Sequence, residues 1–121
     1  MAKNLDIILL LDVYGSLLTD KQRDFISYYY DEDLSLAEIA ENSGISRQGV
    51  RDAIKRAETQ LLDLEDKLGI LRKSKALNNS LNGIISYADT IYNENLNGAL
   101  SPVINDMTVR IRSLCEDLIN E

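Results

Sequence analysis

The residues best suited to chemistry in this 121-residue sequence form a short basic run that also carries an amide and a hydroxyl. They are Ser46, Arg47, Gln48, Arg51, Lys55 and Arg56. An arginine can donate two hydrogen bonds to guanine O6 and N7, and a glutamine can pair with adenine N6 and N7. On a helix, residues follow one another at about 100°, which places Gln48, Arg51 and Lys55 on one side. The run therefore predicts a surface that reads the base edges of duplex DNA.

Other chemistry has little support in the sequence. The chain has no histidine and one cysteine, which excludes an intrachain disulfide, a Cys/His zinc site and a His-dependent nucleophile. No glycine-rich phosphate loop is present, and the acidic run at residues 31–33 lacks the other ligands and the loop glycine of a calcium site. We therefore expect a non-enzymatic protein without a cofactor or a bound metal.

The net charge is −7, and its distribution matters more than its sum. Lys and Arg against Asp and Glu number 3 and 7 in residues 1–33, 8 and 7 in residues 34–75, and 2 and 6 in residues 76–121. Neutralisation of phosphates dominates affinity for nucleic acid. A single copy with one small basic face should bind weakly, so either two faces combine or the partner is not nucleic acid.

Two predicted helices and a tight turn position the basic run. Ser35 and Glu38 have the spacing of a capping box, which starts the first helix. Gly44 can adopt the left-handed conformation that ends it. Ser46 is the expected N-cap of the second helix, whose free amides and dipole suit a phosphate. This is the helix-turn-helix pattern, which also serves in dimerisation and protein docking.

The second helix is expected to continue over residues 47–68, until Gly69 ends it. An apolar seam runs along it with alternating spacings of three and four residues. It consists of Val50, Ile54, Ala57, Leu61, Leu64 and Leu68. Fewer than three heptads are too few to define a coiled coil, so packing on the chain's own helices is the default interpretation. A homodimer is the alternative.

Two further helices are expected before the motif. Residues 4–18 form an opening helix that Gly15 loosens or bends, and its apolar face is made by Leu5, Ile8, Leu9, Val13, Leu17 and Leu18. Thr19 and Gln22 mark a second capping box. The helix that follows should bury Phe25, Ile26 and Tyr29. The tyrosines at 28–30 could stack on bases, but wedging between helices is favoured.

Two helices are expected after the motif, over residues 71–93 and from Ser101-Pro102 to the end. The first opens on a basic cluster, Arg72, Lys73 and Lys75, favoured as a solvated face over an accessory phosphate contact. The apolar stripe of the last helix contains Cys115, a small buried hydrophobe. With no sustained two-residue alternation, the prediction is an all-α bundle of about six helices. Residues 1–69 form the helix-turn-helix domain and residues 70–121 a helical hairpin for dimerisation or packing.

No run of about 18 apolar residues implies a membrane span. The apolar stretch at residues 7–11 is flanked by Asp6 and Asp12, and no small-residue cleavage site follows it, so it does not resemble a secretory signal. We therefore expect a cytoplasmic protein without membrane insertion.

The motif segment resembles region 4 of bacterial sigma factors, which reads a promoter element. The matching residues are Ser35-Leu36-Ala37-Glu38-Ile39-Ala40, Gly44-Ile45-Ser46-Arg47, Val50 and Arg56-Ala57. Residues 5–75 more closely resemble the YlxM-type helix-turn-helix proteins. The residues that carry this second resemblance are Leu17-Leu18-Thr19-Asp20-Lys21-Gln22, Tyr28-Tyr29-Tyr30, Ser46-Arg47-Gln48 and Ile54-Lys55-Arg56.

The YlxM-type proteins are small bacterial cytoplasmic proteins whose genes lie beside those of the signal recognition particle protein and its receptor. The resemblance implies an all-helical nucleic-acid-binding fold and a regulatory role connected with protein targeting. Gly49 stands where an alanine is expected, which weakens helix propensity or lets a backbone come closer.

Three hypotheses follow. The leading one is a dimeric DNA-binding regulator that places the basic face in a major groove. The second keeps the fold and changes the partner to the RNA or the protein of the signal recognition particle. The third is a protein-interaction module with a vestigial reading helix. It is favoured by the acidic net charge and by Asp52 on the exposed face.

Overall fold

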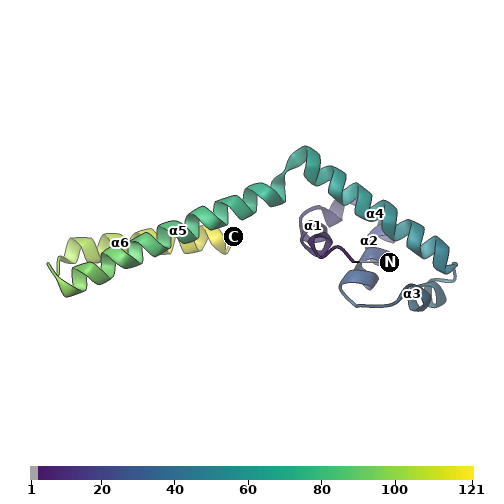
Figure 1. Cartoon of the computed structure of the whole chain (residues 1–121), viewed down its shortest axis with the longest axis horizontal. Helices are drawn as coiled ribbons and strands as arrows, with labels where there is room; N and C mark the ends of the chain where they lie inside the picture. The colour runs from purple at the N-terminus through teal and green to yellow at the C-terminus, as the bar shows by residue number, and fades with distance from the viewer. Residues whose placement is uncertain (1–2) are drawn as a thin grey trace. The chain divides into compact units, whose positions relative to one another are not determined.

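The computed structural model describes residues 3–121, and within that range it contains six α-helices, one 3-10 turn and no strand (Figure 1). The elements are α1 (Asp6–Tyr14), η1 (Gly15–Leu17), α2 (Asp20–Tyr30), α3 (Leu36–Ser43), α4 (Arg47–Leu68), α5 (Ile70–Asn97) and α6 (Pro102–Ile119). This confirms the all-α prediction. The contacts divide the chain into two compact units, one ending at Arg72 and the other beginning at Lys73.

Helix α4 is the centre of the first unit, because α1, α2 and α3 all pack against it (Figure 1). Its buried ridge is formed by Val50, Ile54, Ala57 and Leu61, each with 0% of its surface exposed. The remaining buried residues of this core are Ile7, Leu10, Leu11, Tyr14, Leu18, Phe25, Ile26, Tyr29, Tyr30, Ile39 and Ala40. One helix therefore supplies the surface on which the other three are assembled.

Local signals in the sequence correctly place the helix ends. Thr19 and Ser35 each form the predicted capping box with the residue three positions on. Gly44 and Gly69 end α3 and α4 with φ angles of 73° and 64°, which glycine adopts without a Cβ clash. Pro102 occupies the first turn of α6 after the N-cap. Helix α5, in contrast, extends to Asn97, beyond the predicted end at residue 93.

The predicted face of the opening helix is wrong in part: Leu18 is buried and Ile8 and Val13 pack against the core, but the three other leucines do not. Leu5, Leu9 and Leu17 are 73%, 41% and 57% exposed, whereas the buried positions of α1 are Ile7, Leu10, Leu11 and Tyr14. The stretch is apolar on almost every side, so periodicity alone does not select a face. The α-helix also ends at Tyr14, and the tighter 3-10 turn that follows changes the direction of the side chains.

The adjacent tyrosines of α2 lie in the core, as the favoured interpretation predicts. Tyr29 and Tyr30 are each 7% exposed, and their rings meet edge to face at 5.3 Å between centroids. The Tyr30 hydroxyl donates to Glu58 of α4 at 2.8 Å. Burial, with the nearby carboxylate, raises the pKa of Tyr30 to about 12. Glu58 is only 8% exposed, and sequence patterns did not predict this buried carboxylate.

A second tyrosine–carboxylate pair joins α1 to the junction of α4 and α5. The Tyr14 hydroxyl donates to Glu65 Oε1 at 2.8 Å and accepts from the Ile70 amide at 3.1 Å. The amides of Leu71 and Arg72 also donate to the Glu65 carboxylate, at 3.0 and 3.1 Å. Glu65 thereby satisfies free amides in the first turn of α5.

The second unit contains most of α5 and all of α6, which run antiparallel (Figure 1). Arg112 of α6 pairs with Asp89 of α5 and with Glu116 of its own helix. In the turn, the Asn95 side chain accepts from the Ser101 amide at 2.9 Å and donates to the Ser101 carbonyl at 2.8 Å. Within residues 3–121, no helix has the length and apolar character needed to cross a membrane.

The Glu65 contacts predict an acid-dependent stability. Desolvation raises the pKa of Glu65, but the hydrogen bonds from Tyr14 and two amides outweigh it, and the pKa falls below the usual 4.5. The stabilisation is therefore present above the pKa of the unfolded chain and is lost as the pH falls through the lower folded value. We expect Glu65→Gln to unfold at lower urea concentration than wild type at pH 7, with the difference shrinking below pH ~4.5.

The exposed neighbour Asp66 offers a matched control, because it makes no hydrogen bond or ion pair within residues 3–121. Asp66→Asn should leave the urea midpoint nearly unchanged at pH 7. A Glu65→Gln deficit that stays constant from pH 7 to pH 3.5 would contradict the assigned role of the ionised carboxylate.

Candidate nucleic-acid interface

The segment from α3 to α4 has the geometry of a helix, a tight turn and a second helix. Helix α3 ends where Gly44 takes a left-handed conformation, and its amide donates to the Ala40 carbonyl at 3.0 Å. Ser46 then caps α4, its hydroxyl accepting from the Gly49 amide at 3.0 Å. Helix α3 packs against α4, so the first turn of α4 is held at the outer end of the core.

The basic residues in the amino-terminal half of α4 lie outside the buried ridge. All six predicted site residues, Ser46, Arg47, Gln48, Arg51, Lys55 and Arg56, are exposed. Val50 and Ile54, in the ridge, are completely buried. Among residues 3–121, Arg47, Arg51 and Arg56 form no ion pair. Three guanidinium groups are therefore available to an external anion.

Two other members of the face are held by carboxylates of α4. The Gln48 amide donates to Asp52 Oδ1 at 2.9 Å, and the Lys55 ammonium lies 3.8 Å from Glu58 Oε2. An exposed hydrogen bond of this kind contributes only about 0.5–1.5 kcal/mol. Gln48 can therefore leave Asp52 and pair with a base edge at a modest cost in free energy. The Lys55 ammonium lies near the buried Glu58 and is less available to an external partner.

Gly49 has a local explanation in the geometry of the cap. A Cβ at this position would lie 3.2 Å from Ser46 Oγ and 3.6 Å from Ile45 Cδ1. The hydroxyl that caps the helix would have to shift to admit an alanine. Glycine thus leaves the cap undisturbed, which offsets part of its low helix propensity.

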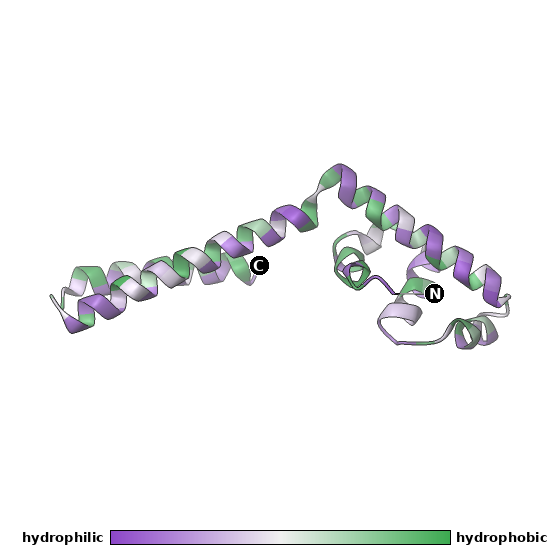
Figure 2. Cartoon of the chain, in the orientation of Figure 1, coloured by the Kyte–Doolittle hydropathy of each residue, from purple (hydrophilic) through white to green (hydrophobic). Residues whose placement is uncertain are grey.

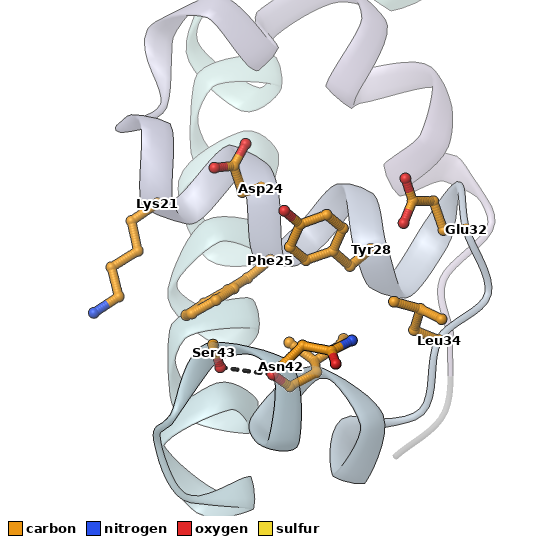
Figure 3. A pocket seen from close by; sticks show the side chains of 9 residues that line it. Lys21, Asp24, Phe25, Tyr28, Glu32, Leu34, Asn42 and Ser43 are labelled. Carbon is orange, nitrogen blue, oxygen red and sulfur yellow. Dashed lines mark hydrogen bonds between the residues drawn. The ribbon is translucent and has the colours of Figure 1, made fainter.

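Two cavities border the motif, and sequence reasoning found neither because their residues come from separate segments. One, of about 350 Å³, lies between the start of α2 and the exposed side of α4, with Asp52 and Arg56 among its lining residues. The other, of about 520 Å³, lies between α2 and α3 (Figure 3). Its apolar residues are Phe25, Tyr28, Leu34 and Ile39, and its charged residues are Lys21, Asp24 and Glu32.

Two predictions outside the motif also have structural answers. Cys115 is 6% exposed, in agreement with its prediction as a small buried hydrophobe. The basic cluster of Arg72, Lys73 and Lys75 is fully on the surface, as the solvated interpretation requires. Groups of three or more side chains able to hold a metal ion are absent from the part of the chain that the structure describes.

Helix α3, the turn at Gly44 and the Ser46-capped helix α4 define a helix-turn-helix protein. The chain belongs to the UPF0122 family, described as "Putative helix-turn-helix protein, YlxM / p13 like", whose model matches residues 1–97. The match spans the first unit and the whole of α5, and α6 lies outside it.

Several bacterial relatives carry the name UPF0122 protein. One from Clostridium kluyveri is 45% identical over 94 residues, which cover 78% of this chain and 85% of the relative. One from Thermoanaerobacter sp. strain X514 is 41% identical over 106 residues, covering 88% and 91%. One from Clostridium botulinum strain Alaska E43 is 54% identical over 74 residues, covering 61% and 68%.

The Ser46 cap of α4 leads to a prediction about stability. Ser46→Ala removes the acceptor of the Gly49 amide, and we expect the free energy of unfolding to fall by about 1 kcal/mol. Urea denaturation followed by circular dichroism measures the change. Ser46→Asn, which retains a capping oxygen, should stay close to wild type, and equal losses in both variants would show that the hydroxyl does not act as a cap.

Proposed function

We propose that this protein is a non-enzymatic, cytoplasmic regulator that binds duplex DNA with the amino-terminal half of α4 in the major groove. The observation that carries the proposal is the exposure of Arg47 and Arg51 at the amino end of α4, outside the buried ridge and without a carboxylate partner within residues 3–121. An α-helix fits the major groove of B-form DNA, and arginine is the commonest reader of guanine there.

The residues divide by their position along α4. Ser46 and Arg47 lie at the amino end, where first-turn amides and the helix dipole favour a phosphate. Gln48, in the same first turn, and Arg51, one turn further, carry the groups that pair with base edges. Lys55 and Arg56 follow at the flank, where a cation contributes to affinity without reading sequence.

Affinity requires more than one copy of this face. Each neutralised phosphate adds about 0.9 to the magnitude of the log-log salt slope, and one face offers few cations on a chain of net charge −7. Two faces carried by a homodimer would double the phosphate contacts and recognise two half-sites. The proposed regulator is therefore dimeric.

A salt series on DNA tests the proposal. We expect the wild-type chain to bind duplex DNA in fluorescence anisotropy with a negative log-log salt slope, and best to sequences selected from a random pool. Arg47→Glu combined with Arg51→Glu should weaken binding at least about tenfold and reduce the magnitude of the salt slope. Affinity would fall because the two unpaired cations of the face are replaced by anions.

Lys67→Glu combined with Lys73→Glu changes the net charge by the same amount away from the amino-terminal half of α4, and both lysines are exposed. This control should lose clearly less affinity. If the two double variants weaken binding equally, or if the wild type shows no salt slope, α4 is not the DNA-reading element.

A second candidate function, a protein-binding module, is supported by the carboxylates on the same face. The Gln48 amide donates to Asp52, and Glu58 lies near Lys55, so two of the six predicted site residues already contact carboxylates of α4. Such a module would form a complex that survives high salt and tolerates Arg47→Ala. The proposed partner is the signal recognition particle, for which the sequence resemblance is the only support.

Structured RNA of that particle is the remaining partner. The major groove of A-form RNA is too narrow for this helix, so contact would run through phosphates and loops. Capture experiments with the particle protein, with and without its RNA, and with duplex DNA as competitor separate the three partners. Recovery of neither component would remove the particle from consideration.

A further inference from the structure

The second unit, Lys73–Glu121, buries very little apolar surface. Its only buried apolar residues are Leu81, Ala88 and Cys115, against fifteen in the core of the first unit. Units of this size usually need a disulfide, a metal or association with another chain. The chain has one cysteine, and residues 3–121 contain no metal-binding group. Association is the remaining source of stability.

Helix α6 carries an apolar seam on its surface. Ile104, Met107, Ile111, Leu114 and Leu118 follow one another at spacings of three and four residues, and they are 38%, 45%, 40%, 66% and 48% exposed. Figure 2 shows hydrophobic residues recurring along both helices of the hairpin. Alternating spacings of three and four over four turns match another helix packed lengthwise. An extended peptide or a small ligand would not require them.

Helix α5 has a corresponding surface. Leu77, Ile84 and Ile91 recur every seven residues and are 53%, 44% and 50% exposed. They alternate with the buried positions Leu81 and Ala88, so the exposed and buried rows form one continuous apolar face. A helix in a bundle has such a wide face because it contacts two neighbours.

The contact between α5 and α6 does not use the exposed seam of α6. The buried positions on α6 are Thr108 and Cys115, one residue after Met107 and Leu114. One edge of the α6 face is therefore covered by α5, and the other edge is free. Two further helices would complete a four-helix bundle.

We infer that the hairpin of α5 and α6 pairs with the same hairpin of a second copy, with the two α6 helices antiparallel across the exposed seam. Charge complementarity identifies the occupant and its register. Arg110 and Asp117 flank the seam at equivalent heptad positions, where interhelical ion pairs form. When Ile111 packs against Leu114 of the second copy, Arg110 lies beside Asp117 of that copy, and symmetry produces the pair twice.

The two side chains are available for this pairing. Asp117 makes no ion pair within residues 3–121. Arg110 contacts only Asp106 of its own helix, at 3.0 Å, and its side chain is 70% exposed. The alternative register, one heptad away, would place Arg110 beside Arg110 of the second copy. The seam therefore selects both the partner and its alignment.

This inference deepens the proposed function, which needs two reading faces, but it is tested without DNA. Sedimentation equilibrium of the full chain, from about 1 to 100 µM, should give twice the chain mass of 13.6 kDa. Leu114→Glu should raise the dissociation constant of the dimer at least about hundredfold, because each dimer loses two buried leucines. The single-chain mass for wild type throughout this range overturns the inference.

Ser113→Glu is the control, because it introduces the same charge at the exposed neighbouring position, off the seam. It should leave the dissociation constant within about threefold of wild type. At concentrations above each variant's dissociation constant, circular dichroism should show unchanged helix content for both, since Leu114 is 66% exposed in the single chain. Equal weakening by the two substitutions overturns the assigned surface.

A charge exchange tests the register independently. Arg110→Asp and Asp117→Arg should each weaken the dimer, because each creates like charges across the seam, and the two together should restore it to within about threefold of wild type. Failure of the double variant to recover overturns the register. A dimer that forms as expected but does not bind DNA would contradict only the proposed function.

Discussion

Burial of one ridge of α4 is the interaction on which the rest of the first unit depends. Val50, Ile54, Ala57 and Leu61 are completely buried, and α1, α2 and α3 pack against this helix. A helix with one fully buried side must present its other side to solvent. The same packing that forms the core therefore leaves the arginines of α4 outside. Folding and exposure of the candidate interface have a single cause.

Two tyrosine–carboxylate contacts, one buried and one half-buried, complete this arrangement. Apolar ridges tolerate small shifts along a helix, whereas a hydrogen bond of 2.8 Å from Tyr30 to Glu58 does not. The contact of Tyr14 with Glu65 does the same for α1 and also supplies acceptors for the first amides of α5. A buried carboxylate is costly unless its oxygens find donors. These pairs therefore specify the alignment of α1 and α2 on α4 more than they add stability.

The distribution of charge along the chain and the proposed pairing of two copies both bear on the proposed function. The chain is acidic overall, and its cations concentrate in the middle segment that contains α4. Acidic flanks disfavour nonspecific contact with phosphates, so the proposed DNA binding would depend on correctly placed arginines and on repetition of the basic face. The apolar seam on α6 offers a physical route to that repetition. In a single copy the hairpin buries little apolar surface and the basic face of α4 carries few cations. The proposed dimer would bury the apolar seam and double the number of cations.

Most helix ends, the turn of the motif and the two faces of α4 can be predicted from the amino-acid sequence. Caps, glycine turns and helical spacing act within a few residues, so short-range patterns suffice to predict them. Short-range patterns do not predict the buried face of α1, the partners of Glu58 and Glu65, the pairing of Gln48 with Asp52 or the cavities beside α2. A stretch apolar on all sides can pack in several ways, and a carboxylate is stable in a core only where a distant donor reaches it. Both depend on which helices meet in space, because packing selects among faces that local periodicity leaves equivalent.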